Sequence, residues 1–116
     1  MKREGVLSIW LGTAQPDIDA IDIFYESHGI GPDVLGDGKD ENCFNSEGRD
    51  IEDIIQLVPF SSSFAGDVVA AARQLRLDVP AWISILYDYA HNPANLDREV
   101  PNEPTFLGVF DYSAQD

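Results

Sequence analysis

Carboxylates are the side chains of this chain with the greatest capacity for chemistry. Twelve acidic residues and only two basic ones lie between Asp17 and Asp53, in a chain of 116 residues with a formal net charge of -14. A group of carboxylates can hold a metal ion, supply an acid–base pair or attract a positively charged partner. The residues around them distinguish these three kinds of chemistry.

A metal site is the first alternative, and the spacing argues against it. The run 33–38 resembles the start of a calcium-binding loop, but Leu35 replaces an oxygen ligand and Phe44 stands where the bidentate glutamate is needed. His28 and His91 have no neighbours at zinc-ligand spacing, and the single cysteine has no cysteine partner. We therefore predict no metal site and no cofactor, and interpret both histidines as ordinary surface or loop residues.

A catalytic site is the second alternative. Asp88 and Asp111 come late in predicted strands, and two neighbouring carboxylates can do acid–base work. We favour the simpler interpretation that both face solvent at strand ends. The run Ser61–Ser63 lacks the Gly-x-Ser-x-Gly turn of a serine nucleophile and has no identifiable base, so we interpret it as a helix cap. We predict no catalytic residues and no enzymatic activity.

Attraction of a partner is the third alternative, and the composition favours it. An excess of one charge steers oppositely charged partners and speeds their association. The acidity favours a basic protein partner and argues against nucleic acid or an anionic membrane. No segment approaches the roughly 20 apolar residues that cross a bilayer, and a single cysteine forms no internal disulfide, so we expect a cytoplasmic protein. A plainer alternative stays open, in which the charge serves only solubility.

The elements that position these carboxylates form one predicted domain, residues 1–116. We expect a small α+β sandwich in which two or three helices pack on a short, mainly antiparallel sheet. The nearly continuous apolar run 82–89 is typical of a central strand buried on both faces. The other predicted strands are 6–11 and 105–112, and the second of these can form a hairpin with 82–89. Helices are predicted at 16–28 and after Ser61–Ser63, and the segment 50–58 is read as a short helix, with a strand at 54–58 as the alternative. A long loop is predicted at 29–48, with one short extended piece near Cys43.

The first predicted helix carries most of the candidate binding residues. Thr13 or Gln15 can cap it, and a stripe at helical spacing, Ile18, Ile21 and Tyr25, predicts the face that packs on the sheet. The carboxylates between them then form an exposed acidic ridge, and a tyrosine beside carboxylates is a common ingredient of an interface. Together with two carboxylates of the following loop, the candidate contacts are Asp19, Asp22, Tyr25, Glu26, Asp40 and Glu41.

The remaining large apolar residues predict the core. The aromatic residues inside apolar strands are expected there, whereas the tyrosines are expected to be more open. The expected core aromatics are Trp10, Trp82, Phe106 and Phe110, and the more open tyrosines are Tyr25, Tyr87, Tyr89 and Tyr112. The late helix is expected to pack through the stripe Phe64, Val68, Ala71 and Leu75.

Four segments, taken in order, resemble the bacterial immunity protein 22 family. They are Val6-Leu7-Ser8-Ile9-Trp10-Leu11-Gly12, Phe60-Ser61-Ser62-Ser63-Phe64, Ile85-Leu86-Tyr87-Asp88-Tyr89 and Phe106-Leu107-Gly108-Val109-Phe110-Asp111-Tyr112. The resemblance extends over nearly the whole chain and is weakest between Gly29 and Asp53. It implies an α+β protein, encoded beside a polymorphic toxin, that binds this toxin and protects the producing cell. It transfers no catalytic or binding residue to this chain.

The leading hypothesis is therefore an immunity protein that inhibits its cognate toxin, expected to be a basic nuclease, by stoichiometric binding. The acidic ridge and loop would occupy a basic cleft of the toxin and block its substrate, with fast electrostatic association and a few buried aromatic anchors. Binding outside the active site of the toxin is the other mode that the sequence leaves open. The first alternative is an acidic adaptor or regulatory module that binds a basic protein unrelated to toxins. A second is a small hydrolase or metal-dependent enzyme, which predicts metal binding or turnover by the isolated protein.

Overall fold

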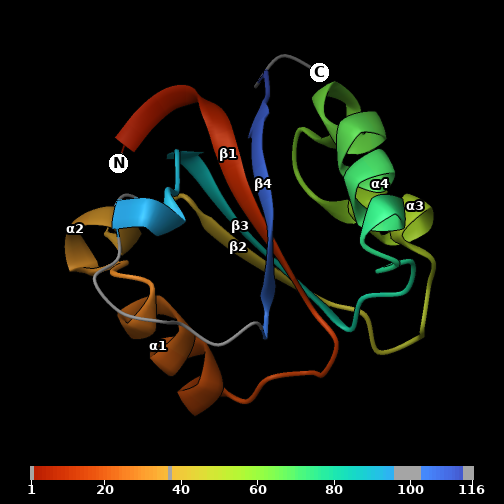
Figure 1. The fold of residues 1–116 in the computed structure, drawn as a ribbon, viewed down its shortest axis with the longest axis horizontal. Helices are drawn as coiled ribbons and strands as arrows, with labels where there is room; N and C mark the ends of the chain where they lie inside the picture. Colours follow the sequence, from red (N-terminus) through yellow and green to blue (C-terminus); the bar gives the residue numbers. More distant parts are fainter. Residues whose placement is uncertain (1, 37, 96–102, 114–116) are drawn as a thin grey trace.

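The computed structural model describes residues 2–36, 38–95 and 103–113, and it contains helices on both sides of one sheet (Figure 1). The strands are β1 (Lys2–Gly12), β2 (Asp40–Phe44), β3 (Trp82–Tyr89) and β4 (Thr105–Asp111). The helices are α1 (Ile18–Ser27), α2 (Pro32–Leu35), α3 (Ile51–Ile54) and α4 (Ala65–Gln74), with 3₁₀ turns at Ile55–Leu57, Ser61–Ser63 and Pro93–Asn95. The expected small α+β fold is confirmed.

The sheet is antiparallel throughout, in the order β2-β3-β1-β4. The central strand predicted at 82–89 is confirmed as β3, which pairs with β1 and with β2. The hairpin of the two late strands is wrong, because β1 lies between β3 and β4 and pairs with both. The long connection between β3 and β4 allows them to be direct neighbours or to have β1 between them. The central place of β1 buries its apolar side chains on both faces of the sheet.

Two hydrophobic clusters, one on each face, hold the three layers together. Leu7, Ile9 and Ile85 point toward α3 and α4, where they meet apolar residues of those helices. Trp10 and Trp82 point the other way, toward α1, and both are buried as expected. Alternate residues of a strand face opposite sides of a sheet, so a strand covered on both sides reads as a continuous apolar run.

The first helix begins one turn later than its expected caps. Asp17, not Thr13 or Gln15, is the N-cap, and its carboxylate accepts a hydrogen bond of 2.8 Å from the backbone N–H of Ala20. Ile18, at the start of the helix, is 77% exposed, so the packed stripe comprises Phe24 and Tyr25, with Ile21 partly buried. The first turn thus presents an apolar residue to solvent.

The middle of the chain is more regular than the predicted loop. The segment 29–48 contains α2 and the edge strand β2, so the single long loop is wrong, although the extended piece near Cys43 is confirmed. These elements are short, and five residues of β2 with one charged end give little periodicity to recognise.

The late helix α4 differs from its prediction at the start and on its packed face. Residues Ser61–Ser63 form a 3₁₀ turn, and Phe64 is the N-cap position with no side-chain hydrogen bond. The buried face consists of Phe64, Val68 and Ala72, whereas Leu75 is 50% exposed. The spacing i, i+4, i+8 places these three residues on one stripe, which turns Leu75 outward.

Candidate protein-binding face

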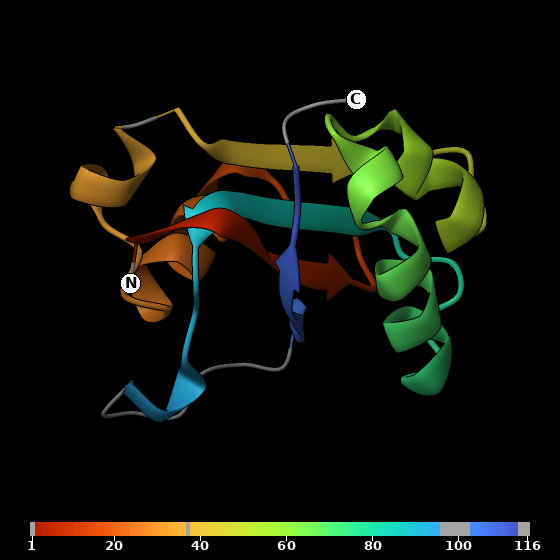
Figure 2. The same ribbon diagram turned by 90° about the horizontal axis from the view of Figure 1, so that it is seen from above.

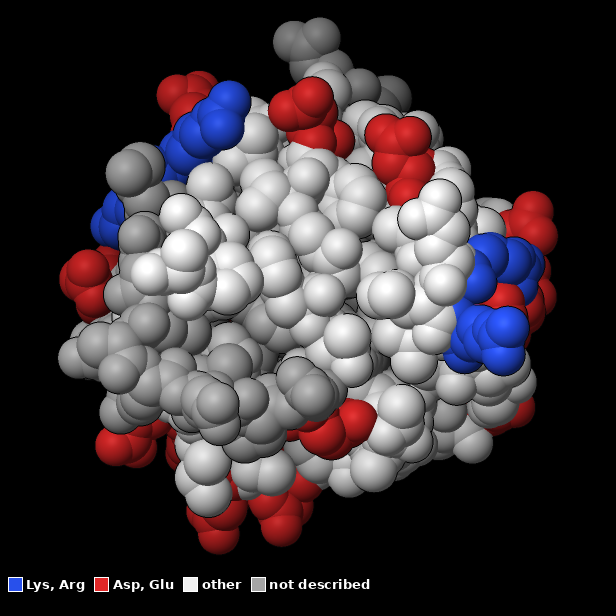
Figure 3. Space-filling view, in the orientation of Figure 1, with Lys and Arg blue, Asp and Glu red and all other residues white. Residues whose placement is uncertain are grey.

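The outer face of α1 is an acidic ridge, as expected. Asp19, Asp22 and Glu26 are all exposed, and α1 contains no basic residue. In Figure 3 the rim over α1 shows acidic side chains and no basic ones, while basic side chains lie on other parts of the rim. The helix therefore presents negative charge to solvent along its length.

Several carboxylates near α3 and α4 pair with arginines. Arg73 donates hydrogen bonds of 3.0 and 2.9 Å to Asp50 and of 2.7 Å to Asp78, and the bonds to Asp50 lower the pKa of the Asp50 carboxyl. Arg49 pairs with Glu47 at 2.9 Å. The ridge differs from this region in that α1 itself contains no arginine or lysine.

Tyr25 is a buried anchor, not the open side chain that was expected. It is 6% exposed, and its hydroxyl accepts a hydrogen bond of 2.9 Å from Asn42 and donates one of 3.4 Å to Asp40. Burial raises the pKa of Tyr25. Asn42 in turn accepts a hydrogen bond of 2.9 Å from the indole of Trp82. This network fastens α1 to β2 and β3, and contact of Tyr25 with a partner stays a prediction.

The two predicted contacts on β2 belong to opposite faces of the sheet. Asp40 shares the α1 face with Asn42, as its hydrogen bond to Tyr25 shows. Glu41 has the parity of Cys43, which packs in the cluster under α3 and α4. The strand alternation that buries Cys43 directs Glu41 away from the acidic ridge. Five of the six candidate residues therefore lie on the α1 side, and Glu41 does not.

Two hollows with apolar linings flank the acidic ridge. The first, of about 410 Å³, lies between the end of α1 and α2, and the second, of about 510 Å³, lies between the start of α1 and the end of β2. Their lining residues are Asp22, Tyr25, Glu26, Gly29, Ile30, Gly31, Pro32 and Leu35 in the first, and Pro16, Asp17, Ile18, Asp19, Ile21 and Phe44 in the second. Each hollow combines an apolar surface with carboxylates, an arrangement that suits a partner with apolar and basic side chains.

Sequence reasoning missed the apolar residues of this surface. Ile18 and Ile23 of α1 are 77% and 63% exposed, and Phe44 at the end of β2 is 46% exposed. Ile23 was the one sign of this surface in the sequence, because it lies outside the predicted apolar stripe of Ile21 and Tyr25 and among the carboxylates of the ridge. Exposed apolar residues inside an acidic surface are the kind of side chain that supplies binding energy at interfaces.

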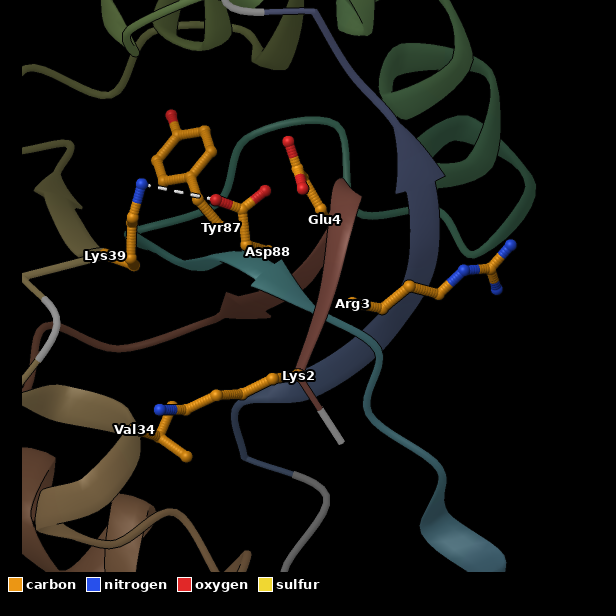
Figure 4. Close-up of a pocket in the computed structure, with 7 residues that line it drawn as sticks. All are labelled: Lys2, Arg3, Glu4, Val34, Lys39, Tyr87 and Asp88. Atoms are coloured by element: carbon orange, nitrogen blue, oxygen red, sulfur yellow. Dashed lines mark ion pairs between the residues drawn. The ribbon is translucent and has the colours of Figure 1, made fainter.

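A third cavity lies beside Asp88, whose carboxylate binds other groups of the fold (Figure 4). This cavity of about 440 Å³ is lined by Lys2, Arg3, Glu4, Val34, Lys39, Tyr87 and Asp88. Asp88 accepts hydrogen bonds from the Gly5 N–H at 3.1 Å and the Tyr112 hydroxyl at 2.7 Å, and pairs with Lys39 at 3.2 Å. In Figure 4 the side chains of Lys2 and Arg3 extend away from Asp88. The basic groups therefore do not converge on one ligand position.

The electrostatics of Asp88 fit a structural role. Burial raises the pKa of Asp88, but hydrogen bonds from Tyr112, Gly5 and Lys39 outweigh it, and the net pKa is lowered. Burial and the neighbouring Asp88 raise the pKa of Tyr112 to about 12. An ionised carboxylate whose oxygens are engaged is a poor proton acceptor. The expectation that Asp88 simply faces solvent is wrong, because its backbone adopts a φ of 57° at the irregular end of β1 and its side chain joins β1, β3 and β4.

The two histidines lie outside the helices and strands, as expected of loop residues, but their rings are buried in the α1-side core and not at the surface. His28 and His91 are 4% and 7% exposed, and their ring centroids are 5.7 Å apart. Burial lowers the pKa of His28, and burial together with His28 lowers the pKa of His91 to about 4. Both rings contact Trp10, with centroid distances of 5.9 and 5.1 Å. At neutral pH they pack as uncharged rings.

Comparison of the chain with protein-family models, with curated proteins and with solved structures found no match. Across the described parts of the chain, no three His, Cys, Asp or Glu side chains gather as a metal ion requires. None of the helices in those parts has the length and apolar character needed to cross a membrane. The functional argument therefore depends on the α1 face and on the resemblance of the sequence segments.

Proposed function

We propose that this protein is a cytoplasmic immunity protein that binds a cognate bacterial toxin with a basic surface, expected to be a nuclease, and neutralises it stoichiometrically. The observation that carries the proposal is the α1 face, an exposed acidic ridge between two hollows with apolar linings. The resemblance to the immunity protein 22 family supports a toxin as the partner.

The two kinds of residue on this face would have different roles in binding. The carboxylates Asp19, Asp22 and Glu26 would attract the basic surface and accelerate association, because long-range attraction acts before contact. Ile18, Phe44 and the apolar lining of the hollows would slow dissociation, since apolar residues are desolvated in the complex. The association rate should fall as salt is added, because the Debye length is only about 8 Å at physiological ionic strength.

Charge reversal on α1 tests the role of the ridge. The variant Asp22→Lys/Glu26→Lys removes two negative charges and adds two positive ones on exposed positions. We expect the association rate with the toxin encoded by the neighbouring gene to fall at least about tenfold at low salt, with a weaker dependence on salt. Stopped-flow or surface-plasmon measurements over a series of salt concentrations give both quantities.

A matched control separates the ridge from net charge. The variant Asp53→Lys/Asp67→Lys makes the same change of charge at exposed positions on the α3 and α4 side. We expect a much smaller change in the association rate, because these positions lie across the sheet from α1. Equal effects of the two variants, or no effect of the α1 variant, would contradict the role of the α1 face.

Protection of cells distinguishes an immunity protein from an acidic adaptor. The two functions use the same surface, but only an immunity protein restores growth to cells that express the toxin. We expect co-expression of this chain to rescue such cells, and the α1 reversal to reduce rescue at low expression. Binding without inhibition or rescue would favour the adaptor, and the absence of binding would remove both functions.

A further inference from the structure

Strand β2 leaves one edge of the sheet open beside the acidic ridge. It is the terminal strand in the order β2-β3-β1-β4, and Figure 2 shows it along the outer side of the sheet. An edge strand presents a row of backbone N–H and C=O groups that can pair with another chain. Proteins usually protect such edges, and the pairing of β2 with β3 shows which of its backbone groups are exposed.

The pairing with β3 determines which backbone groups of β2 face outward. The Tyr87 N–H donates to the Lys39 carbonyl at 2.9 Å, and the Asn45 N–H donates to the Ala81 carbonyl at 2.9 Å. Hydrogen-bonded pairs alternate along an antiparallel ladder, so Glu41 and Cys43 also direct their backbone groups toward β3. The residues between them direct their N–H and C=O groups away from the sheet: Asp40, Asn42 and Phe44.

The side chains near this edge indicate what kind of chain can pair with it. Asp40 lies on the α1 face of β2, and Asp19 belongs to the neighbouring hollow. Phe44, 46% exposed, closes the same hollow at the end of the strand together with Ile18. An added strand would therefore meet carboxylates and an apolar hollow on the α1 side. Basic residues and one apolar side chain on that side of the incoming strand would complement both.

Charge also disfavours a second copy of this chain as the occupant. Edge-to-edge pairing of two β2 strands would bring together two segments 17–53, each with twelve acidic and two basic residues. Like charges in such proximity repel, and the α1 ridges would add to this repulsion when they lie on the same face of a continuous sheet. A basic chain has the opposite sign and gains from the same field.

We propose that an extended segment of the basic partner adds to β2 as a fifth strand of the sheet. The outward groups of Asp40, Asn42 and Phe44 bind its backbone, and the hollow at Phe44 receives one of its apolar side chains. This mode of recognition takes affinity from main-chain hydrogen bonds and specificity from alternate side chains. The inference rests on the proposed function for the identity of the partner, but it concerns a different part of the surface from the centre of the α1 ridge.

Amide hydrogen exchange, read by NMR in the free protein and in the complex with the catalytically inactive toxin of the neighbouring gene, tests the inference residue by residue. In the free protein the amides of Asp40, Asn42 and Phe44 should exchange quickly, whereas those of Glu41 and Cys43 are protected by β3. In the complex the first three should become protected at least about tenfold, which restores protection along the whole strand.

A pair of variants at Phe44 separates the backbone from the side chain. Phe44→Ala removes the ring and keeps the outward N–H, whereas Phe44→Pro removes the ring and the N–H. Proline is tolerated on an edge strand where its nitrogen faces outward, so the pairing with β3 should persist. We expect Phe44→Pro to bind the inactive toxin about tenfold more weakly than Phe44→Ala. Equal affinities of two folded variants would overturn the inference.

The outcomes of these experiments separate this inference from the proposed function. If the toxin binds and is inhibited while Asp40, Asn42 and Phe44 stay unprotected, strand addition is wrong and the immunity function stands. If the toxin neither binds nor is inhibited, both are wrong. Protection of the three amides in the free protein that increases with concentration would identify a second copy as the occupant and would also overturn the inference.

Discussion

Protonation of His91 should destabilise the protein in mildly acidic solution. The imidazole is 7% exposed and lies 4.8 Å from the Phe106 ring and 5.1 Å from the Trp10 ring, measured between ring centroids. Burial, with a further contribution from His28, lowers the pKa of His91 from 6.5 to about 4. As the pH falls, His91 therefore takes up a proton near pH 6.5 in the unfolded chain but only near pH 4 in the folded chain.

The sign and size of the effect follow from this difference. Between pH 6.5 and 4 the unfolded state carries more protons on this residue, so the free energy of unfolding falls as the pH falls. Relative to pH 8, the loss attributable to His91 amounts to about 2.5 kcal/mol at pH 4.5, as an order of magnitude. The lowered pKa of His28 adds to the loss in the same direction. Asp50 and Asp88, whose pKa values are also lowered, contribute losses only near and below pH 3.8.

Urea unfolding at a series of pH values between 8 and 4.5 measures the effect, with His91→Phe as the comparison. Phenylalanine keeps an aromatic ring and the backbone N–H that donates to the Ser8 hydroxyl, but it cannot take up a proton. Relief of repulsion among the carboxylates at low pH affects both proteins equally, so the difference between them isolates the imidazole. We expect the free energy of unfolding of wild type to fall by about 2 to 3 kcal/mol more than that of the variant. Parallel curves for the two proteins would refute the reasoning.

Two further predictions concern the interior. Val68→Ala truncates a fully buried side chain by which α4 packs on the sheet. In urea titrations at pH 7 it should lower the free energy of unfolding by about 1 to 3 kcal/mol. A change of less than about 0.5 kcal/mol would contradict close packing at this position. Tyr112→Phe removes the hydroxyl that donates a hydrogen bond of 2.7 Å to Asp88, and it should lower the free energy of unfolding by about 1 kcal/mol. The pKa values of the other tyrosines should not fall. An equal cost for Tyr112→Phe in an Asp88→Ala background would show that this hydrogen bond is not its origin.

Local pattern was sufficient for most of the regular elements. The nearly continuous apolar run at 82–89 identified a central strand, because a strand covered on both faces must be apolar at nearly every position. The apolar segment 6–11 identified a strand, but not its central place in the sheet. The spacing of Asp19, Asp22 and Glu26 identified the exposed face of α1. Patterns were insufficient for β2 and α2, whose five and four residues complete too few periods to be recognised.

The polar and aromatic residues show the limit of that reasoning most clearly. Tyr25, His28 and His91 have side chains that are equally common at surfaces and inside proteins, and nothing nearby in the sequence predicts their burial. Asp88 acquires its partners from Gly5, Lys39 and Tyr112, which are remote in the chain. Such contacts depend on which strands become neighbours, and a two-residue period carries no information about that.

The sequence by itself thus determined the fold class, the central strand β3 and the acidic outer face of α1, because these depend on composition and on the repeat of side chains along one element. Only the tertiary structure decided that β1 separates β3 from β4, that β2 is an open edge and that Phe44 and Ile18 share a hollow beside the ridge. The physical reason is that burial on one face is a local property of a helix or strand, whereas the order of strands and the position of an edge result from packing of the whole chain.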